Sequence, residues 1–278
     1  MLTAINPRAY SQAFVELLGM LGKHRQLTWE MTRRDITSQY AGQLFGTLWV
    51  IGHPLFLMAL FVFVFSFVFK QRIGGTYELP LDYTTYILAG LVPWLAFQQT
   101  MARACTALTG EANLVKQVVF PIEVLPIKIV IASFIPEAVG LIVLIGYVLV
   151  QYGSLPPSYF LLPVVLVLQA LAMLGVAMMF SAAGVFLRDL KDFVQLFAAA
   201  GIYLMPVVYL PQWVPGPFRP ILYLNPFSYM AWCFQDVLYF GRIEHPWAWL
   251  LFGLGSLFVF VSGYRVFRNL KPQLGNVL

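Results

Sequence analysis

Charged residues are scarce in this chain of 278 residues: only 10% are Asp, Glu, Lys or Arg, whereas soluble domains carry about 25%. Hydrophobic residues make up 60% of the sequence. Repeated apolar runs of about 20 residues match the thickness of a bilayer core, and the backbone groups of a segment in lipid have to be hydrogen-bonded within that segment. The composition therefore excludes a soluble domain and predicts an all-α membrane protein that crosses the bilayer several times.

Cysteine is also rare, and several chemical motifs are missing. Cys105 and Cys233 are far apart and have apolar neighbours, so packing is favoured over a disulfide or a metal site. The sequence contains no G-x-x-x-x-G-K-[ST] loop, no H-E-x-x-H motif and no G-x-S-x-G turn. The scattered His24, His53 and His245 are expected to pack or to form hydrogen bonds. We therefore predict that the chain is not an enzyme, has no catalytic residue, metal or cofactor of its own, and binds no nucleic acid.

Six membrane spans are predicted, at roughly 48–69, 84–108, 127–151, 159–187, 193–211 and 246–267. The alternation in "FVFVFSFVF" (61–69) is typical of a strand, but it lies inside a longer apolar run and is interpreted as helix. The start of the chain has no short apolar core followed by a small-residue cleavage site, so no removable signal peptide is predicted. The whole chain is treated as one domain, with residues 1–43 ahead of a six-span bundle formed by 44–278.

The segment before the first span mixes apolar and basic residues. Phe14, Leu17, Leu18 and Leu21 repeat at helical spacing, which predicts an amphipathic helix lying at the membrane surface. Basic residues gather on the cytoplasmic side of membrane proteins, and twelve against four favour cytoplasmic termini. The cytoplasmic set is Arg8, Lys23, Arg25, Arg33, Arg34, Lys116, Lys128, Arg188, Lys191, Arg265, Arg268 and Lys271. The outer set is Lys70, Arg72, Arg219 and Arg242.

Two connections between spans have unusual compositions. The cytoplasmic stretch "NLVKQVVFPIEVLPIK" (113–128) is too charged for a span and too apolar for a solvated loop, which indicates that something other than water or lipid covers it. The outer connection, 205–246, is rich in proline and aromatic residues and holds two apolar runs too short to cross a bilayer. We favour re-entrant helices there over a plain amphipathic loop outside the membrane.

Charges at membrane depth are candidates for function because they are costly there. The Arg103 side chain can extend to the cytoplasmic surface, so its position can be explained without a functional role. Glu137 could pair with Arg103, line a polar path or lie protonated against a neighbour. Span four also carries small residues on one face, which suit either packing within the chain or a subunit interface. That face is formed by Ala170, Ala177, Ser181 and Gly184.

Aromatic residues make up 16% of the chain, and five phenylalanines at alternate positions from 61 to 69 cover all sides of a helix. Belts at the membrane interface explain part of this content. An aromatic lining that stacks on sugar rings is a further hypothesis, because ring faces offer apolar contact without fixed hydrogen-bond demands.

Five motifs occur in the order found in one transporter family. They are "RDITSQYAGQLFGTLWVIGHPL" (34–55), "AGLVPWLAFQQT" (89–100), "NLVKQVVFPIEVLP" (113–126), "FLRDLKD" (186–192) and "LNPFSYMAWCFQD" (224–236). From about residue 28 to 270 the chain resembles the permease subunits of ABC-2-type exporters of cell-surface polysaccharides, the group that moves O-antigen and teichoic acid. Four positions depart from the family pattern: Thr37 and Gln39 replace common basic residues, Ile122 replaces a frequent Arg, and Gln235 stands where Arg is frequent.

The resemblance implies a channel made of two copies of the chain in a bacterial inner membrane, each docked on one copy of a separate ATPase subunit that binds ATP and Mg²⁺. It implies that residues 28–43 form the surface helix, that the loop between spans two and three is a coupling helix seated on the ATPase, and that the chain between spans five and six is the outer gate. The substrate would be a polyprenyl-linked glycan that enters from the inner leaflet. Two alternatives stay open: an ABC-2 exporter of drugs, haem or smaller lipids, and a membrane-embedded glycosyl- or acyltransferase.

The implied site residues form three groups. The ATPase-coupling group is Glu111, Asn113, Leu114, Val115, Lys116, Gln117 and Phe120. The group at the cytoplasmic interface, where substrate gains access, is Arg33, Arg34, Tyr40, Arg188 and Asp189. The channel and gate group is Phe61, Phe65, Trp94, Arg103, Glu137, Tyr209, Trp213, Tyr223, Tyr229 and Trp232.

Overall fold

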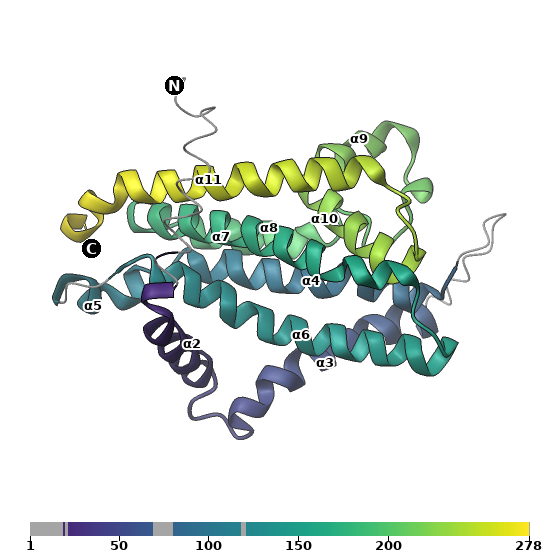
Figure 1. Ribbon diagram of the computed structural model, residues 1–278, viewed down its shortest axis with the longest axis horizontal. Coiled ribbons are helices and arrows are strands. Elements are labelled where there is room, and N and C mark those ends of the chain that lie inside the picture. Colours follow the sequence, from purple (N-terminus) through teal and green to yellow (C-terminus); the bar gives the residue numbers. More distant parts are fainter. Residues whose placement is uncertain (1–18, 20–21, 69–79, 118–120, 278) are drawn as a thin grey trace.

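The computed structural model describes residues 19, 22–68, 80–117 and 121–277, and within them every regular element is a helix. Four long helices lie side by side (Figure 1). They are α4 (Tyr83–Ala104), α6 (Val124–Tyr152), α7 (Leu162–Phe186) and α11 (Pro246–Val277). The predicted all-α class is confirmed for the described part of the chain. Phe14, Leu17, Leu18 and Leu21 lie outside it.

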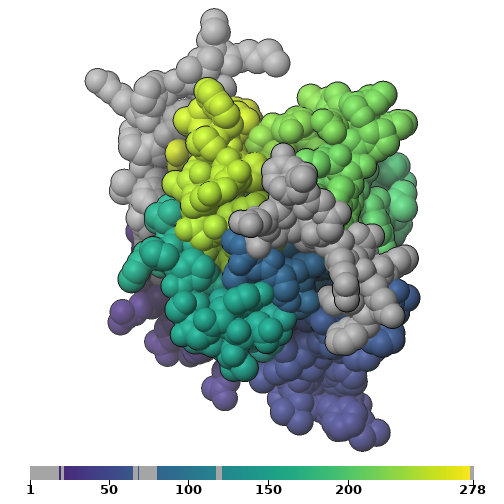
Figure 2. Space-filling model, turned by 90° about the vertical axis from the view of Figure 1, so that its right-hand side faces the viewer, coloured from purple at the N-terminus to yellow at the C-terminus, as the bar shows by residue number. Residues whose placement is uncertain are grey.

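Shorter elements mark the two ends of the bundle. The helix α5 (Ala112–Gln117) and the C-terminus of α11 lie at one end, and α9 (Arg219–Leu224) lies at the other (Figure 1). Figure 2 faces the second end and shows the green surface around α9 and α10 (Pro226–Gln235) at the upper right, with α3 (Trp49–Val62) at the bottom. The remaining short helical segments are η2 (Gly46–Leu48), η3 (Phe63–Val68), η4 (Thr109–Glu111), η5 (Pro157–Leu161), η6 (Pro211–Trp213), η7 (Gly216–Phe218) and η8 (Asp236–Phe240).

Three helices are long and apolar enough to cross a membrane, namely Val124–Tyr152, Pro157–Phe186 and Pro246–Gly275. They coincide with predicted spans three, four and six. Predicted span one appears as the shorter apolar helix Gly46–Val62, which continues into η3, so "FVFVFSFV" is helical as predicted. Predicted span two, α4, has 22 residues but is more polar, because it carries polar side chains such as Thr85 and Thr100 that are buried against neighbouring helices.

The predicted span at 193–211 is not one continuous helix, and whether it crosses the membrane stays a prediction. The helix found there, α8 (Leu190–Gly201), has 12 residues, and the chain then runs through turns to Leu210. A helix of that length rises only about 18 Å, which is less than a bilayer core. The last residue of α8, Gly201, lies against the Trp94 indole, where a Cβ would overlap that ring. Pro206 follows, and its ring disfavours a helical residue before it.

The carbonyls of this turned segment are hydrogen-bonded by side chains from other helices. The Tyr86 hydroxyl donates to the carbonyls of Pro206 (2.9 Å) and Tyr209 (3.1 Å), and the Gln235 amide also donates to Pro206 (2.7 Å). The Tyr83 hydroxyl donates to the Val208 carbonyl. Backbone without regular helix is stable at membrane depth only where protein buries it and satisfies its polar groups. Residues 205–208 are buried, and the carbonyls of Pro206 and Val208 meet that condition.

The α7–α11 pair packs backbone against backbone at two glycines. A Cβ at Gly175 would overlap the Val259 carbonyl, and a Cβ at Gly263 would overlap the Gly175 carbonyl. Small residues let two helices approach this closely. The small face of α7 is also buried within the chain at Ala177, Ser181 and Gly184, and a Cβ at Gly184 would overlap the Cys105 carbonyl.

A Gly263→Ala substitution is expected to lower the stability of the purified protein by about 1–3 kcal/mol, because the new methyl group meets rigid backbone rather than a movable side chain. The matched control is Gly253→Ala on the same helix, where nothing lies within 4 Å of an added Cβ. This control should leave stability unchanged or raise it by up to about 1 kcal/mol. Thermal unfolding in detergent measures both, and equal midpoints for the two variants would contradict the close crossing.

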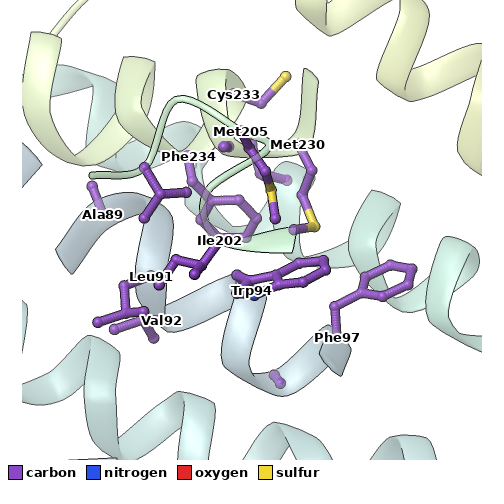
Figure 3. Packing of buried hydrophobic residues seen from close by; sticks show 14 of the residues in the cluster. Ala89, Leu91, Val92, Trp94, Phe97, Ile202, Met205, Met230, Cys233 and Phe234 are labelled. Carbon is purple, nitrogen blue, oxygen red and sulfur yellow. The ribbon is translucent and has the colours of Figure 1, made fainter. Parts of the chain in front are cut away.

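The interior divides into a large core and a second core near α5. In the large core the fully buried Trp94 indole lies among Ile202, Met205 and Met230 (Figure 3). The second core, which we call the cytoplasmic core after its predicted location, joins the loop after α4, the start of α6 and the second halves of α7 and α11. Its buried members are Leu108, Ile122, Leu125, Ile127, Met178, Ala182, Phe260, Val261, Tyr264, Phe267 and Leu274.

Candidate functional site

The short helix α5 projects from the bundle between two ion-paired anchors. Before it, the Glu111 carboxylate accepts a hydrogen bond from Lys128 Nζ of α6 at 2.9 Å. After it, the Glu123 carboxylate accepts from Lys271 Nζ near the end of α11 at 2.5 Å. Both partners belong to long helices, so the loop is fixed to the bundle at each of its ends.

A larger ion-pair network joins α2 (Arg25–Gln39) to the same anchor. The Asp35 carboxylate accepts from the Arg103 guanidinium of α4, and its other oxygen lies 3.8 Å from Lys128 Nζ. The Lys128 side chain is only 6% exposed, so its charge depends on these partners rather than on water. Lys128 therefore links α2, α4, α6 and the start of the loop, and we call Asp35, Arg103, Glu111 and Lys128 the Lys128 network.

The coupling residues predicted from the sequence divide into two sides of α5. Asn113 and Lys116 are exposed, while Leu114 and Val115 are half-buried, and Val115 packs against the cytoplasmic core. Gln117 is the last residue of α5, and Phe120 lies outside the described residues. The structure thus presents a short helix whose inner side is held by apolar contacts and whose outer side is free of packing within the chain.

The residues predicted for the cytoplasmic interface lie mostly on the surface. Arg33 and Arg34 on α2 and Arg188 and Asp189 before α8 are exposed. Tyr40, just after α2, is half-buried and lines a cavity.

This cavity, of about 570 Å³, lies between α3, α4 and α6. Its wall includes Glu137, which is 2% exposed and whose Oε2 accepts from the Gln169 amide at 3.2 Å, while Oε1 has no partner. Gln169 also donates to the Pro93 carbonyl. The suggested pairing of Glu137 with Arg103 was wrong, because Arg103 pairs with Asp35 and Glu137 with Gln169.

The predicted gate residues fall into a buried and an exposed group. Trp94 and Trp232 are buried and Phe61 packs against the large core, whereas Trp213 is 42% and Tyr223 54% exposed. Two half-buried tyrosines brace their own turns: the Tyr209 hydroxyl donates to the Tyr203 carbonyl, and the Tyr229 hydroxyl donates to the Tyr223 carbonyl. The side chain of Phe65 lies outside the description. The role of these residues in a gate stays a prediction.

The outer connection is organised around buried Asp236. Its carboxylate accepts from the backbone N–H of His245 and from the Trp249 indole, both at 3.0 Å, and lies 2.8 Å from His245 Nδ1. The His245 ring stacks on Trp232 with centroids 5.3 Å apart. As predicted for the histidines, His245 packs and forms hydrogen bonds. The network fixes η8 to the start of α11.

Several of these residues were missed in the sequence. Asp35 was quoted only within a motif, Glu123 only as a charge of the 113–128 stretch and Lys271 only as one of the basic residues; an acidic residue directly after two arginines was a usable signal for Asp35. Gln98 and Gln99, which also line the cavity, were quoted only within a motif. A pair of adjacent glutamines in an apolar helix was the signal, since amides are costly in lipid.

Comparison with known proteins adds the family. The sequence model described as ABC-2 type transporter matches residues 26–239, more than half of the chain. Two O-antigen export system permease proteins RfbA of Klebsiella pneumoniae are each 26% identical over 250 residues, covering 89% of this chain and 93% of the relative. The protein of the same name from Myxococcus xanthus is 25% identical over 264 residues, covering 93% of this chain and 98% of the relative.

Proposed function

The chain belongs to the ABC-2 type transporter family, and we propose that it is the membrane permease subunit of a transporter that exports a cell-surface polysaccharide of the O-antigen kind. Relatives that carry the name of O-antigen export permease align over nearly their full length, which supports this substrate class. The observation that carries the proposal is α5, a short helix with an unpacked outer side, held by ion pairs at both ends.

The proposed arrangement has six crossings of a bacterial inner membrane, with both termini in the cytoplasm. The crossings are α3 with η3, α4, α6, α7 with η5, α8 with the turned segment after it, and α11. The basic residues favour this orientation, because α5 and the C-terminus lie at the same end of the bundle. In it α2 lies at the cytoplasmic membrane surface, where its exposed Trp29 reaches the interface.

The outer connection supports a re-entrant gate. The short helices α9 and α10 meet at Asn225 and Pro226, where the Asn225 side chain caps α10 by accepting from the Phe227 N–H at 3.0 Å. Residues 230–239 are buried against α4 and α11 rather than lying on the surface. We propose that this hairpin enters the membrane from outside and that exposed Trp213 and Tyr223 line the way out.

Energy is proposed to come from a partner. Two copies of the chain form the channel, and each docks through α5 on one copy of a separate ATPase that binds ATP and Mg²⁺. The family membership supports a partner of this kind. The exposed Asn113 and Lys116 supply the contact, and a polyprenyl-linked glycan enters from the inner leaflet near Arg33, Arg34 and Arg188, whose charges suit an anionic lipid head.

Deletion of the gene tests the proposal. Surface polysaccharide should be lost, and its polyprenyl-linked precursor should accumulate in the inner leaflet of the inner membrane. Accumulation of a different small lipid or drug with normal surface glycan would favour an exporter of smaller molecules. A precursor that lacks a sugar or acyl group would favour a transferase, and either result would overturn the proposed substrate.

A further inference from the structure

The cavity between α3, α4 and α6 is lined by an unusual number of polar side chains for the interior of a membrane bundle. Besides the indole of Trp49, six of its lining residues can form hydrogen bonds through their side chains: Tyr40, Gln43, His53, Gln98, Gln99 and Glu137. They come from the segment after α2, from α3, from α4 and from α6, so the fold brings them together from four separate parts of the sequence.

These side chains lack partners in the protein. Within the described part of the chain, the only side-chain hydrogen bond that any of the six makes is the one between Glu137 Oε2 and Gln169. Glu137 Oε1 is buried and unpartnered. Gln43 and His53 are exposed and need no partner in the protein. Buried polar groups are nearly always hydrogen-bonded, so the unpartnered Glu137 Oε1, in one lining with the half-buried amides of Gln98 and Gln99, points to a ligand that satisfies them.

The lining also limits the chemistry of that ligand. Among the described residues no Lys or Arg lines the cavity, and Arg103 and Lys128 are engaged by Asp35 and Glu111, so this part of the lining offers no cation for a diphosphate. Amide, phenol, imidazole and carboxyl groups are instead the partners that sugar hydroxyls need. The Trp49 ring, half-buried in the wall and edge-to-face with Phe45, adds an aromatic surface for the apolar face of a sugar.

We propose that this cavity binds a sugar unit of the exported glycan within each copy of the chain, apart from any channel formed between two copies. Gln98 and Gln99 hydrogen-bond the sugar hydroxyls, Glu137 Oε1 takes one further hydroxyl, and Trp49 packs against the ring. The inference rests on the proposed function, and it adds a recognition site for sugar as opposed to lipid or phosphate.

The test uses full-length protein in nanodiscs and reads the fluorescence of Trp49, isolated by comparison with Trp49→Phe. The first probe is the lipid-free glycan released from the cell surface, and the second is polyprenyl phosphate without sugar. The lipid-free glycan should change Trp49 fluorescence, and polyprenyl phosphate should not. A Gln98→Leu/Gln99→Leu variant should bind the glycan about tenfold more weakly, because two neutral hydrogen bonds are lost.

Gln151→Leu is the matched control, since Gln151 is exposed at the far end of α6 and should bind like wild type. If the double variant cannot be purified, His53→Ala, at an exposed lining residue, is measured in its place and should also bind more weakly. The inference is overturned if the glycan leaves Trp49 unchanged, if polyprenyl phosphate alone gives the full signal, or if the cavity variants bind as wild type does. If one of these results is found while glycan export still depends on the gene, the sugar site is wrong and the proposed function stands. If surface glycan is normal after deletion of the gene, the sugar site and the proposed function are both wrong.

Discussion

A Lys128→Ala variant is expected to be less stable than wild type by about 3 kcal/mol, the largest loss that we predict for a single substitution. The ammonium group is 6% exposed and lies within ion-pair distance of both Glu111 and Asp35. Removing it leaves the Glu111 and Asp35 carboxylates without their shared cation, although Asp35 keeps its pair with Arg103. We expect a stability loss at the lower end of the range for broken buried ion pairs, because Glu111 is 36% exposed and water can hydrate its carboxylate.

Thermal unfolding in detergent measures this loss, with Arg242→Ala as the control. The Arg242–Glu244 pair has the same type of contact at 2.8 Å, but its side chains are 74% and 41% exposed, so its removal should cost less than about 1 kcal/mol. Equal losses of stability in the two variants would show that burial of the Lys128 network adds nothing to the stability of the protein.

A Lys116→Glu variant is expected to lose nearly all polysaccharide export while the permease stays folded. Lys116 is exposed on the outer side of α5 and makes no contact that holds the bundle together, so reversing its charge disturbs only what docks there. Like charges brought together at an interface cost several kcal/mol, so the affinity for the ATPase should fall roughly a hundredfold or more.

Co-purification with the ATPase measures docking, and the amount of surface glycan measures export. Lys23→Glu reverses the charge of another exposed lysine, ahead of α2, and should keep both. If Lys116→Glu retains the ATPase and exports normally, α5 is not the coupling element. If the variant fails to fold, then Lys116 has a structural role that the geometry does not show.

The apolar runs and the low content of charged residues were enough to predict the helical class and most helix positions. The runs at 127–151, 159–187 and 246–267 all became long helices, because a segment of that length and composition has few alternatives in lipid. Span five could not be predicted in this way. Its residues are also largely apolar, but the helix stops at Gly201, and the turned backbone that follows is held by side chains distant in sequence, such as those of Tyr83 and Tyr86.

The departures from the family pattern have local explanations that only the structure supplies. Ile122, in place of a frequent Arg, is 7% exposed and belongs to the cytoplasmic core. Gln235 donates to the Pro206 carbonyl. Gln39, with its amide oxygen turned toward α4, accepts from the Arg103 guanidinium, where a Lys would bring a like charge. Each depends on a neighbour distant in sequence, which a single sequence does not reveal.

The candidate site was predictable from the sequence only in part. The exposed side of α5 follows from local sequence, since a short charged helix between prolines and glycines has little to pack against. The Lys128 network and the polar cavity were not predictable, because four separate segments supply each of them. Charge and amide side chains were visible in the sequence, but their partners were not.

The turned segment 202–210 has a consequence for the order in which this protein is built. Its carbonyls take hydrogen bonds from Tyr83 and Tyr86, made long before it, and from Gln235, made 29 residues after Pro206. While the ribosome is still translating that stretch, the Pro206 carbonyl lacks its second donor. The hydrogen bonds of the segment are therefore complete only once α10 has been made, so we expect residues 202–210 and α10 to fold together.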